Sequence, residues 1–157
     1  MKEYNLNTKL RAYQWNELSE EDRKLIDIAK EQTERSYCPY SHFHVGAAAQ
    51  LANGEIIRGC NQENAAYPVG LCAERTAIFA AGVQYPDVPV KALAIAARTP
   101  GGQLQDEPVS PCGSCRQVLI ETETRFHQPV RILLYGTKKV YVIDGISNLM
   151  PLSFTEF

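Results

Sequence analysis

Residues 43–61 read FHVGAAAQLANGEIIRGCN and predict a β-hairpin near the centre of the fold. Two runs, Phe43 to Ala52 and Glu55 to Asn61, are rich in residues that favour strands and flank the dipeptide Asn53-Gly54. Asn-Gly between two such runs is the strongest short hairpin signal, because both residues tolerate the positive φ of a tight turn. We therefore expect two adjacent antiparallel strands here.

Helices and further strands are predicted on both sides of the hairpin. Ser19 is a good N-cap for a helix that runs to Arg35, and acidic residues follow it at the positive end of the helix. The other expected elements are a helix from Leu71 to Gly82, a strand from Val90 to Ala97, a helix from Ser114 to Thr124, and strands from Val130 to Tyr135 and Lys139 to Ile143. This order predicts an α/β fold, a three-layer α/β/α sandwich around a mixed five-stranded sheet.

The length of 157 residues suits a single domain, 1–157, that buries an ordinary core. Residues 1–18 are expected to be an N-terminal extension of that domain, in which Tyr13 and Trp15 either dock an arm or pack against the core. The formal net charge of −2 gives no electrostatic footprint for a polyanion, so a small molecule is a better candidate partner than nucleic acid.

The cysteine count and the hydropathy pattern bear on where the chain resides. Five cysteines is an odd number, and three are assigned below to a metal, so no disulfide framework is expected. The first residues lack the apolar core of a signal peptide, and no run is long enough to span a bilayer. We expect a cytoplasmic protein without a membrane partner, with Cys38 and Cys60 as buried small hydrophobic residues.

Three cysteines and one glutamate form the candidate active site. Cys72 lies two residues before Glu74, while Cys112 and Cys115 have the i, i+3 spacing that lets two thiolates reach one metal from a single helical turn. Both segments fall at predicted helix starts, where free N–H groups stabilise thiolates. Three ligands leave a fourth tetrahedral position of Zn²⁺ open for water, which is typical of catalytic sites, and Glu74 is the candidate acid–base group.

A structural zinc site is the alternative reading of these cysteines, because a single C-x-x-C is common. A structural site closes with four ligands and does not require Glu74. Arg75 and Arg116 each follow a ligand segment, and we expect them to donate hydrogen bonds to sulfur and offset the charge of three thiolates. A solvated helix surface is the alternative location for both arginines.

Five ordered motifs extend this pattern over about three quarters of the chain. They are YSHFHVGAA at 40–48, GCNQENAAY at 59–67, CAER at 72–75, PCGSCRQ at 111–117 and LMPLSF at 149–154. Together they resemble the cytidine deaminases of the short, homotetrameric, three-cysteine type, within the cytidine/deoxycytidylate deaminase superfamily. The chain departs from the family pattern at Gln62, where an apolar residue is common, and at Leu152-Ser153, which replaces a smaller pair.

The resemblance implies roles for further residues. Asn61 and Glu63 would bind the ribose 3′-hydroxyl, Phe43 would pack beside the base, and the Ala73 backbone would hydrogen-bond the pyrimidine. Tyr67 and Phe154 would reach the active site of a neighbouring subunit, so the sites of a homotetramer would be shared. One Zn²⁺ per subunit is implied as cofactor.

The expected function is hydrolytic deamination of cytidine and deoxycytidine to uridine and deoxyuridine, with release of ammonia, in pyrimidine salvage. One alternative is deamination of a related small substrate, such as a blasticidin-type nucleoside. Another is a non-catalytic binding module stabilised by zinc, in which Glu74 would have no task. Polynucleotide editing is disfavoured by the acidic balance of charge.

Overall fold

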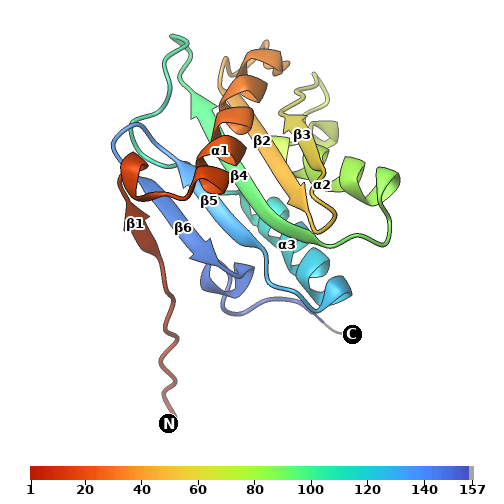
Figure 1. Cartoon of the computed structure of the whole chain (residues 1–157). Coiled ribbons are helices and arrows are strands. Elements are labelled where there is room, and N and C mark those ends of the chain that lie inside the picture. Colours follow the sequence, from red (N-terminus) through yellow and green to blue (C-terminus); the bar gives the residue numbers. More distant parts are fainter. Residues whose placement is uncertain (156–157) are drawn as a thin grey trace.

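A single mixed sheet with helices on both faces makes up the computed structural model, which describes residues 1–155 (Figure 1). The strands are β1 (Arg11–Tyr13), β2 (His44–Leu51), β3 (Ile56–Cys60), β4 (Val90–Arg98), β5 (Arg131–Tyr135) and β6 (Val140–Asp144). The helices are α1 (Glu20–Gln32), α2 (Ala73–Gln84) and α3 (Gly113–Phe126), with short 3₁₀ turns that include η4 (Ile146–Asn148).

The sheet order is β1-β6-β5-β4-β2-β3, and only β4 and β5 pair in parallel. The three-layer α/β/α prediction is confirmed, but the prediction of five strands is wrong because the described chain has six. The sixth strand, β1, comes from the segment expected to be an N-terminal extension, and it pairs antiparallel with β6 at the edge of the sheet. None of the helices within residues 1–155 is long and apolar enough to cross a membrane.

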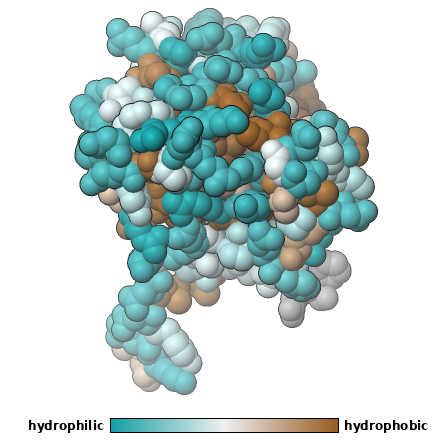
Figure 2. All heavy atoms as spheres, viewed as in Figure 1, coloured by the Kyte–Doolittle hydropathy of each residue, from teal (hydrophilic) through white to brown (hydrophobic). Residues whose placement is uncertain are grey.

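Strand alternation divides the core into two layers. Ala48 and Ala94 pack with Ile26 of α1 on one face, whereas Ala49 and Ile95 belong to the cluster of α2 and α3 on the other. The helix that covers the first face presents a hydrophilic outer surface in the view of Figure 2. The buried alanines of β2 and β4 have small side chains, which allow the helices to lie close to the sheet.

The predicted helix and strand limits need small corrections. Ser19 caps α1 as expected, since its Oγ accepts a hydrogen bond from the Asp22 amide at 3.1 Å. Gly82 does not end α2, which continues to Gln84 before Tyr85 and Pro86. A glycine inside a helix costs only about 1 kcal/mol, and the buried inner face of α2 offsets this cost.

Candidate metal centre and active site

Two helix starts bring the three predicted cysteines together. Cys72 is the N-cap of α2, Cys112 is the N-cap of α3, and Cys115 lies in the first turn of α3. The Cys72–Cys112 and Cys112–Cys115 Sγ distances are 3.7 and 3.5 Å, and all three Sγ atoms lie within 4.8 Å of one another. Cys72 lies forty positions before Cys112 in the sequence, so the fold itself brings it to the other two cysteines.

The spacing of the sulfurs fits a tetrahedral metal ion. With Zn–S bonds of about 2.3 Å at tetrahedral angles, neighbouring sulfurs are about 3.8 Å apart. The observed 3.5 and 3.7 Å separations are close to this value. In the residues described, this is the one group of His, Cys, Asp or Glu side chains arranged to hold a metal, and it offers three ligands. A zinc ion held here keeps a fourth coordination position for another molecule.

The charge distribution among the sulfurs is uneven without a metal. The pKa of Cys72 is lowered to about 5, first by the hydrogen bond of this thiol with Cys115 and then by the guanidinium of Arg75. The same hydrogen bond and burial raise the pKa of Cys115, so Cys72 carries the negative charge first. Arg75 Nη2 lies 3.7 Å from Cys72 Sγ and 3.3 Å from the Gly70 carbonyl oxygen. The predicted contact of Arg75 with sulfur is therefore present in the structure.

Arg116 makes different contacts from those predicted. Its Nε donates to the Pro111 carbonyl at 2.9 Å and its Nη1 to the Leu149 carbonyl at 2.7 Å. No hydrogen bond from Arg116 to a sulfur is formed among the described residues, so the expected neutralising contact is absent there. The arginine side chain instead fixes the backbone on either side of the cluster.

Glu74 lies in the first turn of α2 and is only 5% exposed. Burial raises the pKa of its carboxyl group, and the charge of Cys72 acts in the same direction. The backbone amide of Glu74, and to a smaller extent the Cys115 thiol, oppose this shift in the pKa, as expected for a carboxyl group beside the sulfur cluster. A buried carboxyl group with a raised pKa next to three thiols is a candidate general acid–base group.

A cavity of about 680 Å³ opens onto this cluster. Ligand sites of small molecules have volumes of roughly 300–1,000 Å³. Its lining includes the predicted residues Cys72, Cys112, Glu74, Arg75, Phe43, Asn61, Glu63 and Tyr67. Ala73 is fully buried and Phe154 belongs to the tail, and neither is among the lining residues. The structure thus brings together most of the predicted site in one chain.

Asn61 and Glu63 are already engaged with the strand and turn beside them. Asn61 Oδ1 accepts from the Val45 amide and its Nδ2 donates to the Phe43 carbonyl, both within 2.9 Å. Glu63 accepts hydrogen bonds from Ser41 Oγ and from the amides of Tyr40 and Ser41. The Ser41 hydroxyl is the main cause of the lowered pKa of Glu63, which keeps this carboxylate ionised.

Tyr40, Ser41 and Ser110 are among the lining residues that received no role from the sequence. Tyr40 packs edge-on against Tyr67 with ring centroids 5.9 Å apart, and Ser41 anchors Glu63. Ser110 lies on the loop before α3. The Tyr40-Ser41 pair belongs to a quoted motif, and its neighbour Pro39 marks a turn that could have indicated a binding role.

The expectation of buried small residues is confirmed for Cys38 but not for Cys60. Cys38 is buried, but its Sγ lies 3.1 Å from His44 Nδ1, and Ser36 Oγ lies 2.7 Å from the same nitrogen. Cys60 is partly exposed, and its thiol donates to the Arg35 carbonyl at 3.3 Å. All five cysteines are free thiols in this structure.

A three-layer α/β/α domain with three thiols and a buried glutamate at two helix starts defines a zinc-binding enzyme of the hydrolytic class. The pattern of the cytidine and deoxycytidylate deaminase zinc-binding region matches residues 19–127. The chain therefore belongs to this family of zinc-dependent deaminases.

Individual relatives agree with this assignment. Cytidine deaminase from Halalkalibacterium halodurans is 46% identical over 139 residues, which cover 83% of this chain and 92% of the relative. The crystal structure of cytidine deaminase from Burkholderia pseudomallei is 36% identical with a TM-score of 0.73, covering 87% of this chain and 100% of that one. Blasticidin-S deaminase from Bacillus cereus is 31% identical over 88% of this chain and 96% of its own length.

Proposed function

We propose that the chain deaminates cytidine and deoxycytidine hydrolytically, giving uridine or deoxyuridine and ammonia. The observation that carries this proposal is the buried carboxyl group of Glu74, which shares one cavity with the thiol cluster and with Asn61 and Glu63. A purely structural zinc site would not need a buried acid, and burying one without a task costs free energy. The relatives named cytidine deaminase support the same substrate.

In this proposal Cys72, Cys112 and Cys115 hold the zinc ion as thiolates. Bound zinc would lower the pKa of a water molecule at the open position by several units and so supply a nucleophile for hydrolysis. Arg75 stabilises the Cys72 thiolate through its contact with Sγ. The charge of three thiolates is thereby partly offset by a residue of the same helix.

Glu74 acts in both halves of the reaction. It accepts a proton from water and delivers it to N3 of the pyrimidine ring, which makes C4 more electrophilic. The water oxygen bonds to C4, and Glu74 takes the second proton from the hydroxyl group so added and passes it to the exocyclic amine. The C4–N bond then breaks and ammonia leaves. The raised pKa of Glu74 suits this exchange, because a carboxyl group that is always ionised would be a poor proton donor.

The sugar and the base would be held by the residues around the cavity. Glu63 keeps an ionised carboxylate at the rim, and each amide atom of Asn61 retains capacity for one more hydrogen bond. These groups can bind the ribose 3′-hydroxyl. Phe43 lines the cavity and can pack beside the base. Hydrogen bonds from the Ala73 backbone to the pyrimidine would need this residue to be accessible, and Ala73 is fully buried in the single chain.

We also propose a homotetramer in which neighbouring chains complete each site. Tyr67 and Phe154 are 74% and 63% exposed, as expected for aromatic residues that pack against another subunit. Phe79 and Val83 expose apolar surface on α2. A single species of four chains by sedimentation equilibrium is expected, and a monomer that is fully active would contradict shared sites. Five free thiols suit a reducing compartment, so we propose the cytoplasm.

A blasticidin-type nucleoside is the second candidate substrate, because the similarity to Blasticidin-S deaminase covers most of this chain. Ammonia release should be measured with the zinc-loaded protein and cytidine, deoxycytidine, deoxycytidylate and blasticidin S as separate substrates. We expect kcat/KM to be highest for the two nucleosides. Preference for blasticidin S would replace the proposed substrate, and zinc binding without release of ammonia from any of them would favour a binding module.

A further inference from the structure

The N-terminal strand β1 lies outside the segment that matches the deaminase family, which begins at residue 19. We infer that this strand positions the C-terminal tail: it holds Asn148, and through it the segment from Leu149 to Phe154, against the helix that carries Cys115. This inference rests on the proposed role of Phe154 in substrate binding. It assigns an effect on substrate binding to a strand that contributes no residue to the cavity lining.

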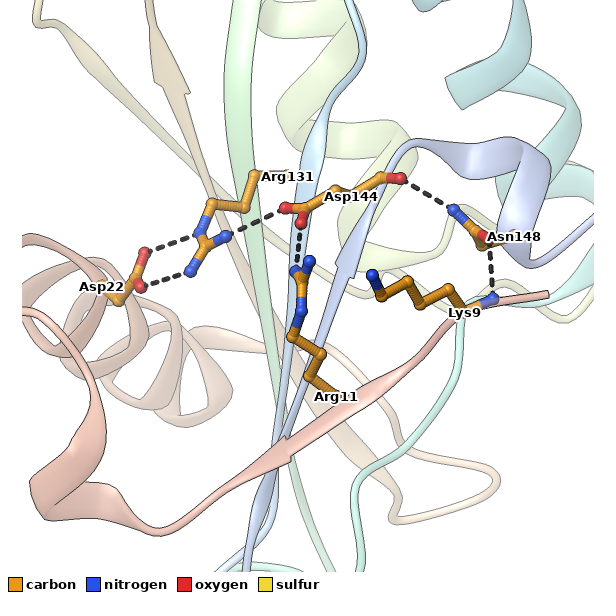
Figure 3. Close-up of polar contacts among 6 residues, drawn as sticks. All are labelled: Lys9, Arg11, Asp22, Arg131, Asp144 and Asn148. Atoms are coloured by element: carbon orange, nitrogen blue, oxygen red, sulfur yellow. Dashed lines mark hydrogen bonds and ion pairs between the residues drawn. The ribbon is translucent and has the colours of Figure 1, made fainter.

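Asn148 is the residue where the strand meets the tail. Its Oδ1 accepts a hydrogen bond from the Lys9 amide at 2.8 Å, and its Nδ2 donates to the Asp144 carbonyl at 2.8 Å (Figure 3). Lys9 is 139 positions from Asn148 in the sequence, so this contact joins the two ends of the chain. Asn148 ends η4 and directly precedes the tail.

Ion pairs hold β1 in the register that this contact requires. Arg11 pairs with Asp144 at the end of β6, and Arg131 bridges Asp144 to Asp22 of α1, with Nη–Oδ distances of 2.9 and 3.0 Å (Figure 3). The Asp22 side chain is only 10% exposed, so this end of the network is shielded from solvent. The network ties the short strand to both β5 and α1.

The tail is held from the opposite side by α3. Arg116 Nη1 donates to the Leu149 carbonyl at 2.7 Å, one residue beyond Asn148, and Gln117 Nε2 donates to the Phe154 carbonyl at 2.8 Å. Arg116 Nε also donates to the Pro111 carbonyl next to Cys112. Asn148 and Leu149 are therefore clamped between β1 and the start of the metal-site helix.

The distribution of contacts argues for a local effect. Leu149 and Met150 pack against the core at the start of the tail, whereas Phe154 at its far end is 63% exposed, so hydrogen bonds contribute to the order of the exposed part. Loss of one such hydrogen bond shifts an equilibrium about fivefold, which is small for the whole domain but large for the order of a short exposed segment. Loss of the Asn148 contacts should loosen the tail without unfolding the sheet.

The test compares Asn148→Ala with Ser147→Ala, a change at the exposed neighbour in the same 3₁₀ turn. Amide hydrogen exchange and the kinetics with cytidine are measured on the zinc-loaded, full-length protein. For Asn148→Ala we expect exchange of residues 149–154 to become about fivefold faster and kcat/KM to fall about fivefold, mainly through KM. Ser147→Ala should change neither. In a Phe154→Ala background, Asn148→Ala should cause no further fall.

Unchanged exchange in the tail of Asn148→Ala would overturn the inference whatever the activity. Equal losses of kcat/KM from Asn148→Ala with and without Phe154 would also overturn it, since the effect would not pass through the tail. If Phe154→Ala leaves kcat/KM unchanged in an active enzyme, the catalytic consequence is refuted while deamination stands. Absence of ammonia release by wild type would instead refute the proposed function, and the exchange data would still decide whether β1 holds the tail.

A second pair of variants covers the case in which Asn148→Ala does not fold. Deletion of residues 2–13 removes β1 and the Lys9 amide, whereas deletion of residues 2–8 leaves both in place. The longer deletion should speed exchange in the tail and the shorter one should not. Equal behaviour of the two deletions would contradict the inference.

Discussion

Gly59 lies where β3 approaches the start of α2, and replacing it tests how the fold positions the metal ligands. A Cβ atom at this position would lie 2.4 Å from the Ala73 carbonyl oxygen and 2.6 Å from the Ala77 amide nitrogen. Both are backbone atoms of the helix capped by Cys72, so no side chain can rotate away. Gly59→Ala must therefore push the first turn of α2 away from the sheet.

The size of that movement follows from the contact distances. Restoring a van der Waals separation of about 3.5 Å requires α2 to retreat by about 1 Å. Metal–ligand distances tolerate only about 0.2 Å, so Cys72 would leave its ligand position unless the fold absorbed the shift elsewhere. Overpacking of this kind costs about 1–3 kcal/mol, and we expect the Tm to fall by roughly 2–12 °C.

The assay measures Tm by calorimetry and bound zinc by elemental analysis on the same samples. Gly82→Ala is the matched control, because this glycine lies on the same helix with no atom within 4 Å of the added Cβ. Gly82→Ala should raise stability by about 0.5–1 kcal/mol and keep zinc. Wild-type Tm and full zinc occupancy in Gly59→Ala would refute the view that this close approach sets the ligand geometry.

Three further outcomes are expected. Cys112→Ala should lose bound zinc, whereas Ser114→Ala, at an exposed position of the same turn, should retain it; full occupancy in Cys112→Ala would exclude this ligand. Removal of zinc by a strong chelator should lower the Tm, and added zinc should restore it, since metal binding stabilises the folded state. The pKa of Asp144 is lowered by the hydrogen bond from Arg11 and, next, by that from Arg131. The carboxylate of Asp144 therefore stabilises the fold above about pH 4, and this contribution is lost as the pH falls through the lowered pKa. Asp144→Asn should therefore cost less than about 1 kcal/mol at pH 7 and nothing near pH 2 by urea unfolding; an equal cost at both pH values would contradict this origin.

The layers of the fold and the metal cluster were predictable from sequence because their signals are local and strong. Asn53-Gly54 gave the hairpin, and Gly54 has the positive φ of 90° that such a turn uses. The short spacings around Cys72 and Cys112 placed the ligands at helix starts without knowledge of tertiary structure. The division into a single domain with residues 1–18 as an extension remains a prediction, although part of that segment lies in the sheet.

The missed features depend on partners distant in sequence. β1 has only three residues, too few for a periodic pattern, and its place is set by β6 and by ion pairs with Asp144. Arg116 was expected at sulfur because of its position after Cys115, but two carbonyl oxygens compete successfully for its guanidinium. The hydrogen bond of Asn148 with Lys9 has no signal in either segment alone.

The most direct test of the acid–base role of Glu74 is the turnover of cytidine by zinc-loaded Glu74→Gln beside wild type. Glutamine preserves shape but cannot carry a proton, so kcat should fall by about 10⁴-fold or more, at or beyond the upper end for acid–base groups, because Glu74 acts in two steps. Zinc content should stay unchanged, and Glu121→Gln, at an exposed position of α3, should retain full activity. Near-normal turnover by Glu74→Gln with zinc bound would show that Glu74 is not the acid–base group of the reaction.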